Sequence, residues 1–196
     1  MKKSIYICFL LQVNFDLALI LMITFRIAQF QDVQAIATLH AQSWKKHYRG
    51  MLRDAYLRNE VVEDRLSVWT QRLSEPAQNQ WILLAEEARQ LCGFTCVYLN
   101  EHQRWGAYLD NLHVASQWQG RSLGKQLMQA AAAWVNEEVP SSGMYLWVLS
   151  QNNSAIRFYE KIGGTNYEEV IDELPGGGQG PILRFVWTDL QQLINL

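Results

Sequence analysis

The stretch DNLHVASQWQGRSLGKQLM, residues 110–128, combines several groups that can bind an anion. Its pattern changes from strand to helix near Gly120 and Gly124, and Arg121 and Lys125 add two cationic side chains. The start of a helix leaves backbone N–H groups without partners, and together with the helix dipole these donors favour phosphate groups. The stretch therefore predicts a phosphate site, although a glycine near a helix start is also compatible with a plain turn.

A second segment that could do chemistry is NNSAIRFYEKIGG, residues 152–164, which follows the next predicted strand. It is predicted to form a short helix that ends at Gly163. Tyr159 carries a phenol, which can donate a proton to a leaving group, but the apolar spacing of this helix would equally make it a core aromatic residue. Asn153 is expected either to bind a ligand or to cap the helix.

The two segments together resemble the GNAT superfamily of acyl-CoA-dependent N-acetyltransferases. The family's central motif, Gln/Arg-x-x-Gly-x-Gly/Ala, is similar to the run from Gln119 to Gly124. Its second motif, Asn-x-x-Ala-x-x-Phe-Tyr-x-x-x-Gly, is similar to the run from Asn153 to Gly163, and the resemblance spans residues 23–190. The chain departs from the family at Ser122, where a glycine is usual. Because serine does not freely adopt a positive φ, the pyrophosphate affinity or the shape of the turn is expected to differ.

The resemblance implies acetyl-CoA as co-substrate, without a metal ion. Its pantetheine arm is expected to pair with the strand backbone at Leu112 and Val114 as an added strand. A backbone N–H near Val114 would polarise the thioester carbonyl, and Tyr159 would act as the general acid for the leaving thiolate. The predicted coenzyme-binding residues are Leu112, His113, Val114, Gln119, Gly120, Arg121, Ser122, Leu123, Gly124, Lys125 and Asn153.

The implied acceptor is a primary amine of a small molecule or a protein. A lysine-like amine has a pKa of about 10.4 and is mostly protonated at neutral pH, so its attack needs a proton acceptor. Asp110 is predicted to share a strand face with Leu112 and Val114, because these residues are two apart. Asp110 is therefore a candidate catalytic base, and a solvated or capping carboxylate is the alternative.

Three further features are candidates for the acceptor site. Trp44 and Tyr48 are four residues apart in a predicted helix, where they either form an aromatic edge of the site or pack in the core. The acidic residues within 168–173 would attract a cationic amine, or they are the solvated face of an edge strand. The glycine-rich loop at residues 175–180 is expected to act as a lid or as a simple connector.

Hydrophobic periodicity predicts the elements that position these groups. The expected order is one strand, helices, three strands, a helix, a strand, a helix and two strands, which is a mixed α/β (α+β-like) arrangement. The resemblance implies a GNAT-type fold: one central, mostly antiparallel sheet of about six or seven strands, with helices on both faces. Residues 23–196 are expected to form a single N-acetyltransferase domain. The predicted strands are 23–30, 81–88, 91–99, 105–115, 143–149, 165–174 and 181–190, and the predicted helices are 33–39, 43–73 with a break near Gly50, 123–139 and 153–162.

Composition sets the broad class of protein. Of 196 residues, 49% are hydrophobic and 18% are charged, so the chain can form a substantial core. The net charge of −2 and the lack of a basic tract argue against a nucleic-acid partner. The three cysteines have no metal-ligand spacing and the four histidines form no HxxxH pair, which indicates reduced thiols, no metal site and a cytoplasmic protein.

Residues 1–22 differ from the rest of the chain. Two lysines precede an apolar run, as in a signal peptide, but no small-x-small cleavage site follows. Gln12, Asn14 and Asp16 interrupt the run, and one Asp near the middle of a membrane helix costs about 2.5–3.5 kcal/mol. We therefore expect an apolar extension that need not belong to the domain, rather than a membrane anchor.

Three functions remain from the sequence. The first is an N-acetyltransferase that moves an acetyl group from acetyl-CoA to a primary amine by direct attack. The second is a non-catalytic acyl-CoA-binding sensor of the same fold, favoured if Ser122 weakens turnover and Asp110 is not a base. The third is a membrane-tethered interaction protein that uses residues 1–22. The expected partner is the amine acceptor, and a homodimer is compatible with the sequence.

Overall fold

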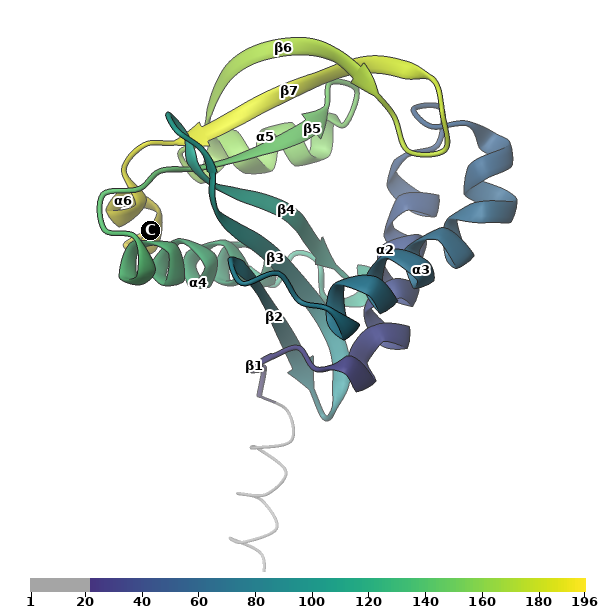
Figure 1. The fold of residues 1–196 in the computed structure, drawn as a ribbon, viewed down its shortest axis with the longest axis horizontal. Helices are drawn as coiled ribbons and strands as arrows, with labels where there is room; N and C mark the ends of the chain where they lie inside the picture. The colour runs from purple at the N-terminus through teal and green to yellow at the C-terminus, as the bar shows by residue number, and fades with distance from the viewer. Residues whose placement is uncertain (1–21) are drawn as a thin grey trace, which may run out of the picture.

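The computed structural model describes residues 22–196, so residues 1–21 of the predicted extension and Cys8 lie outside it (Figure 1). A short 3-10 turn precedes the first long helix, and a π-helical turn at Tyr56–Glu60 precedes the second. The strands are β1 (Thr24–Ile27), β2 (Gln80–Glu87), β3 (Gln90–His102), β4 (Gly106–Val114), β5 (Met144–Leu149), β6 (Thr165–Glu173) and β7 (Gln179–Trp187). The helices are α2 (Val33–His47), α3 (Val61–Ser74), α4 (Leu123–Glu138), α5 (Asn153–Lys161) and α6 (Leu190–Ile194).

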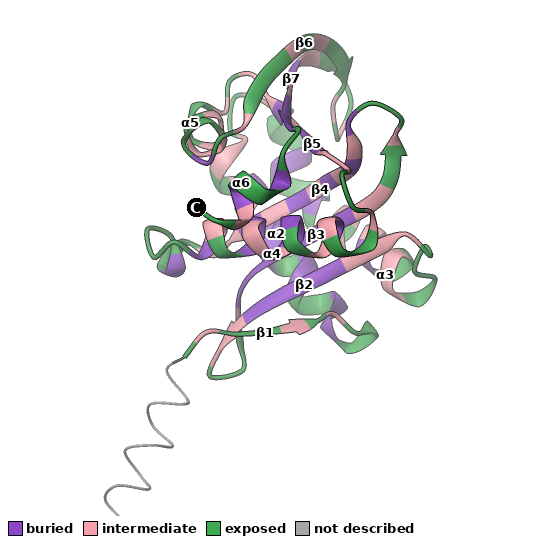
Figure 2. Ribbon diagram, turned by 90° about the vertical axis from the view of Figure 1, so that its left-hand side faces the viewer, coloured by how far each residue is buried: buried purple, intermediate pink, exposed green. Residues whose placement is uncertain are grey.

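The seven strands form one sheet in the order β1-β2-β3-β4-β5-β7-β6. Every neighbouring pair is antiparallel except β4 and β5. Figure 2 shows buried residues along β2 and β4 in the middle of the sheet, whereas β1 and β6 at its edges are largely exposed. The structure thus confirms the predicted mixed α/β fold with a central, mostly antiparallel sheet.

Helices cover both faces of this sheet. On β2, Ile82 and Leu84 pack with side chains of α2 and α3, whereas Leu83 and Ala85 pack with Leu127 of α4. Successive side chains of a strand point to opposite faces, so α2 and α3 lie on one face and α4 lies on the other. Helix α5 packs against the same cluster as α4 and therefore lies on that second face.

The parallel neighbours β4 and β5 separate after a short contact. Only two pairs of described residues are in register, Ala107 with Met144 and Tyr108 with Tyr145. Further along, β4 stays paired with β3 and carries a bulge at Asp110, while β5 stays paired with β7. The two strands run apart toward their C-terminal ends (Figure 1), which leaves one edge of β4 without a neighbouring strand.

The observed element boundaries differ from the predicted ones at the end of the first strand, at β3, in α2, which continues unbroken from Val33 to His47, and at β7, which ends at Trp187 before α6 begins at Leu190. The first strand ends at Ile27 rather than near residue 30, because the Asp32 carboxylate accepts hydrogen bonds from the Gln29 backbone N–H and the Arg26 guanidinium and turns the chain. Strand β3 extends to His102, beyond the turn expected at residue 100. The predicted break in the long helical region is present, at residues 48–53.

From residue 22 onward, no helix combines the length and the apolar character needed to cross a bilayer. The two cysteines in this part of the chain, Cys92 and Cys96, are buried free thiols. Burial raises the pKa of both thiols, so neither forms a thiolate readily at neutral pH.

The closed end of the β4–β5 pair gives a stability prediction. Gly106 has φ +78°, and a Cβ there would overlap Ser142 Oγ and the Gly143 carbonyl oxygen. We expect G106A to lower the free energy of unfolding by about 3 kcal/mol, from backbone strain and from overpacking. Gly163 has φ +82°, and a Cβ there would meet no atom within 4 Å, so G163A should cost only about 1–2 kcal/mol. Denaturant unfolding measures the free energy of unfolding of both variants. An equal loss of stability in G106A and G163A would contradict the steric overlap at Gly106.

Candidate active site

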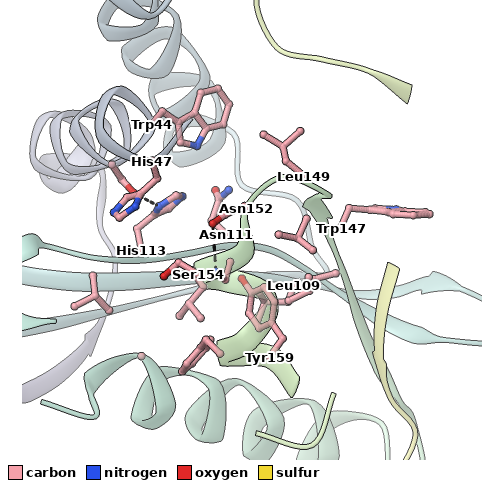
Figure 3. Close-up of a pocket in the computed structure, with 18 of the residues that line it drawn as sticks. Trp44, His47, Leu109, Asn111, His113, Trp147, Leu149, Asn152, Ser154 and Tyr159 are labelled. Atoms are coloured by element: carbon pink, nitrogen blue, oxygen red, sulfur yellow. Dashed lines mark hydrogen bonds between the residues drawn. The ribbon is translucent and has the colours of Figure 1, made fainter. Parts of the chain in front are cut away.

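A cavity of about 750 Å³ opens where β4 and β5 separate (Figure 3). Its walls come from α2, α3, β4, the turn before α4, β5, α5 and the loop between β6 and β7. This volume falls within the range of small-molecule sites, roughly 300–1,000 Å³. The cavity is therefore large enough for an extended ligand that reaches from the start of α4 to the β6–β7 loop.

The free edge of β4 supplies backbone groups to this cavity. The Ala115 N–H donates to the Cys92 carbonyl oxygen of β3 at 2.8 Å. Because successive residues of a strand direct their backbone groups to alternate sides, Leu112 and Val114 direct theirs away from β3 and into the cavity. The Gln119 side chain donates to the Val114 carbonyl oxygen at 3.0 Å. The N–H groups of Leu112 and Val114 thus face the cavity, while the Val114 carbonyl already has a partner.

The turn before α4 concentrates backbone donors. Within residues 22–196, the N–H groups from Gly120 to Lys125 have no hydrogen-bond acceptor. Gly120 and Ser122 both lie in the left-handed region, with φ of 78° and 60°. Ser122 therefore does adopt the positive φ that serine disfavours, at a cost of about 1–2 kcal/mol. Unpaired N–H groups at a helix start form a site for an anion.

Most of the predicted coenzyme-binding residues line the cavity, and two do not. Arg121 and Asn153 are exposed and lie outside the lining. Asn152, one residue earlier, caps α5 by accepting a hydrogen bond from the Ala155 N–H at 3.2 Å, and it also lines the cavity. Because two asparagines, Asn152 and Asn153, stand at the start of this helix, the sequence does not show which of them is the N-cap. The residues that line the cavity are Leu112, His113, Val114, Gln119, Gly120, Ser122, Leu123, Gly124 and Lys125.

Two of these residues also hold neighbouring elements in place. Gly124 of α4 lies beside the Phe158 ring of α5, and a Cβ on it would be 3.4 Å from that ring, an ordinary van der Waals distance. The Lys125 ammonium donates to the Leu196 carbonyl oxygen at 2.7 Å. The start of α4 is thus in contact with both α5 and the last residue of the chain.

Tyr159 reaches the cavity from α5. Its ring packs against Phe185 and Trp187, with centroid distances of 5.7 and 5.9 Å. Figure 3 shows its hydroxyl pointing into the cavity. Burial, with a smaller contribution from Tyr48, raises the pKa of Tyr159 well above its ordinary value. Tyr159 therefore packs against the hydrophobic core with its ring and presents a protonated phenol to the cavity.

Asp110 lines the cavity, but its side chain does not lie as predicted. It is the residue without a partner at the β4 bulge, and it forms an ion pair with Arg72 of α3 at 2.5 Å. Leu112 and Val114 instead pack toward the cluster of α4. The predicted common face of Asp110, Leu112 and Val114 is wrong, because the bulge inserts one residue and reverses the alternation.

Trp44 and Tyr48 both line the cavity from the last turns of α2. Trp44 is buried, and the Arg65 guanidinium carbon lies 4.3 Å from its ring centroid. Tyr48 lies 5.4 Å from Trp44, centroid to centroid. Burial and the charge of Asp110 raise the pKa of Tyr48 to about 12. Both predicted alternatives therefore hold for Trp44, which lines the cavity and also belongs to a buried cluster with Leu52.

Two residues of α2 that were not predicted, Ser43 and His47, line the cavity together with the predicted His113 of β4. His113 Nδ1 lies 2.9 Å from Ser43 Oγ. Burial is the main cause that lowers the pKa of His113 to about 3, so its imidazole is neutral. His47 lies one turn after Ser43 and lines the same cavity. The spacing of Ser43 and His47, parallel to that of Trp44 and Tyr48, is the sequence signal that could have revealed them.

The β6–β7 loop forms the far wall of the cavity. Leu174 and Pro175 line it, together with Asp172 and Glu173 at its rim. At Gly176 the loop packs directly on the Tyr56 ring, and a Cβ there would overlap that ring. The loop is therefore a wall held against the π-helical turn before α3.

The turn before α4 gives a second stability prediction. Ser122 is exposed and has φ +60°, so glycine relieves strain at this position and a β-branched residue increases it. We expect S122G to raise the free energy of unfolding of the ligand-free protein by up to about 1 kcal/mol and S122V to lower it by at least as much. Denaturant unfolding measures both. A stability order with S122V above S122G would show that the turn is not left-handed.

Known proteins with this sequence pattern and fold are acetyltransferases. The model of the "Acetyltransferase (GNAT) family" matches residues 39–164. YuaI of Bacillus subtilis, described as an uncharacterized N-acetyltransferase, is 25% identical over 182 residues, which cover 89% of this chain and 98% of YuaI. The structure of PaiA N-acetyltransferase from Thermoplasma acidophilum in complex with coenzyme A matches with a TM-score of 0.64 and 20% identity, over 85% of this chain and 99% of PaiA.

A variant of spermidine N-acetyltransferase SpeG from Vibrio cholerae matches with a TM-score of 0.63 and 17% identity, over 88% of this chain and 97% of that protein. At these identities the solved structures show the fold alone. The family model, by contrast, covers well over half of the chain, including the turn before α4 and all of α5. The chain therefore belongs to the GNAT family of acetyltransferases.

Proposed function

We propose that this protein transfers the acetyl group of acetyl-CoA to a primary amine by direct attack. The observation that supports this most is the continuity of one cavity from unpaired N–H groups at the start of α4, along the free edge of β4, to the hydroxyl of Tyr159. These three parts match the three parts of an acyl-CoA: a pyrophosphate, an amide-bearing arm and a thioester.

The residues present fit the coenzyme at each position. The donors from Gly120 to Lys125 would hold the pyrophosphate, because they lie at a helix start and lack partners within residues 22–196. The N–H groups of Leu112 and Val114 would bond the pantetheine amides, as in the addition of a strand to a sheet edge. PaiA, which shares this fold, was solved with coenzyme A.

The chemistry then requires a polarised carbonyl and a proton donor. One of the backbone N–H groups on the β4 edge would bond the thioester oxygen, on which negative charge develops during attack. As the new C–N bond forms and the C–S bond breaks, the thiolate takes the proton of the Tyr159 hydroxyl. The raised pKa of Tyr159 keeps the phenol protonated at neutral pH, so the proton is present when the thiolate forms.

The acceptor end of the cavity favours a cationic amine with an apolar body. Aromatic and aliphatic side chains of Trp44, Tyr48 and Leu174 line its walls. Two of the cationic side chains that line the cavity are paired, Arg65 with Asp64 and Arg72 with Asp110. Asp172 and Glu173 at the rim have no ion-pair partner among the described residues. The local field at the rim therefore attracts positive charge.

The test of this function has two steps. Calorimetry with acetyl-CoA and the full chain should show saturable binding. Thiol release should then be measured with acetyl-CoA and a panel of primary amines: hexylamine, 2-phenylethylamine, spermidine and a lysine-containing peptide. Release with at least one amine is the expected result. If acetyl-CoA binds but no amine causes thiol release, the result would favour the non-catalytic acyl-CoA sensor. The ion pair of Asp110 with Arg72 is a reason to test that alternative.

Removal of the Tyr159 hydroxyl tests the general acid. We expect Y159F to lower kcat by about 10²–10⁴-fold while acetyl-CoA affinity stays within about twofold, because only proton transfer is lost. The matched control is Y167F, since Tyr167 is exposed on β6 and lies outside the cavity. Stopped-time assays of thiol release provide the measurement. A Y159F enzyme with the kcat of Y167F would remove Tyr159 from the reaction.

Removal of the rim charges tests the acceptor end. We expect D172N/E173Q to raise the KM for a cationic amine by about fivefold at low salt, with kcat unchanged, because the charges attract the acceptor before binding. At 1 M salt the difference should vanish, since the Debye length falls to about 3 Å. E169Q is the control, because Glu169 is exposed on the same strand and does not line the cavity. An equal effect in E169Q would indicate general rather than local attraction.

A further inference from the structure

The attacking amine must lose a proton, and the structure narrows the groups that can take it. Asp110, which the sequence predicted as the catalytic base, accepts a hydrogen bond from Arg72 Nη1 at 2.5 Å. The same Arg72 nitrogen also donates to Asn111 Oδ1 at 3.1 Å, so guanidinium and carboxylate form part of one connected cluster. The Asp110 carboxylate is therefore already engaged by a side chain of α3.

His47 has no such engagement. It is the last residue of α2, it is half-buried, and it lines the cavity. Its ring has no hydrogen-bond partner among the residues that the structure describes. In Figure 3 its ring lies beside that of His113. His113 lies between Leu112 and Val114, so His47 is close to the segment of β4 that would hold the thioester end of the coenzyme.

The protonation state of His47 suits a base. Burial, and to a smaller extent the charge of Lys46, lowers its pKa below the ordinary value for histidine. The ring is therefore unprotonated at neutral pH, with a lone pair available. His113 is less suitable, because its pKa is lowered to about 3 and its Nδ1 is bonded to Ser43. A base with a pKa closer to the working pH transfers protons more effectively.

We propose that the His47 imidazole is the general base that accepts the proton of the attacking ammonium, directly or through one water. This inference rests on the proposed function. In the step, one N–H bond of the acceptor breaks, the proton moves to an imidazole nitrogen, and the released lone pair forms the bond to the acetyl carbon. As the C–S bond breaks, the thiolate takes the proton of Tyr159, and the second proton lost by the acceptor nitrogen restores the phenol, directly or through water. Lys46 precedes His47 on α2, and the ionisable side chains that line the cavity with His47 include Tyr48 after α2, Arg65 and Arg72 on α3, and Asp110 and His113 on β4.

The test is the pH dependence of kcat/KM for the full chain with acetyl-CoA and its best amine. The wild type should show an acid limb that rises as His47 loses its proton and then a plateau. H47Q should lower kcat/KM by about 10²-fold or more and remove this limb, while calorimetry shows unchanged binding of coenzyme A. Added imidazole should restore part of the activity of H47A, which a purely structural defect would not allow.

Two further variants make the assignment specific. K46Q should keep its activity and move the acid limb to higher pH, because the loss of a neighbouring positive charge raises the pKa of His47. D110N should leave the acid limb in place even if turnover falls. The proposal is overturned if H47Q keeps the wild-type acid limb, or if D110N rather than H47Q removes it. Absence of acetyl transfer by the wild type would overturn the proposed function first, and this inference with it.

Discussion

The separation of β4 from β5 after two paired residues is the constraint on which the rest of the structure depends. A strand in the middle of a sheet normally satisfies its backbone groups on both sides, and an unpaired edge in the interior is costly. Here the edge of β4 beyond Leu109 is free, although β4 is the fourth of seven strands. Only a ligand or water can complete its hydrogen bonds, and this is what makes the middle of the sheet a binding site.

The bulge at Asp110 is the local device that shapes this edge. It lets two successive side chains, Asp110 and Asn111, approach the same arginine of α3. Arg72 thereby connects the end of α3 to the point where β4 turns away from β5. Its guanidinium lies over the aromatic rings of Trp69 and Tyr98, and these contacts hold it in place. The acid that sequence reasoning assigned to proton transfer is thus, in the structure, also part of a contact between a helix and the bulge.

The sequence allowed the sheet, its helices and the turn before α4 to be predicted, because each depends on local periodicity or on local backbone chemistry. Tyr159 could be placed for the same reason, since its helix has a recognisable motif. The face of Asp110 could not be predicted, because counting in steps of two assumes a regular strand and one inserted residue reverses every later position. The contact of Gly176 with Tyr56 was also beyond reach, because it joins segments far apart in the chain. His47 belongs to no motif, and its four-residue spacing from Ser43 gained a meaning only when the structure placed both in the cavity wall.

The cavity is built from two sets of residues that depend on different parts of the chain. The end near α4 uses residues 112–125, which belong to the sheet and the helix that follows it. The opposite end uses the segment around α2 and α3 and the tip of the β6–β7 hairpin, which meet through Gly176 and Tyr56 outside the strand pairing. The loop at the tip of this hairpin takes no part in the pairing of β4, so substitutions in it can reshape this end of the cavity without altering the register of β4. The wall at one end of the cavity can thus change while the backbone edge and the helix start at the other end stay as they are.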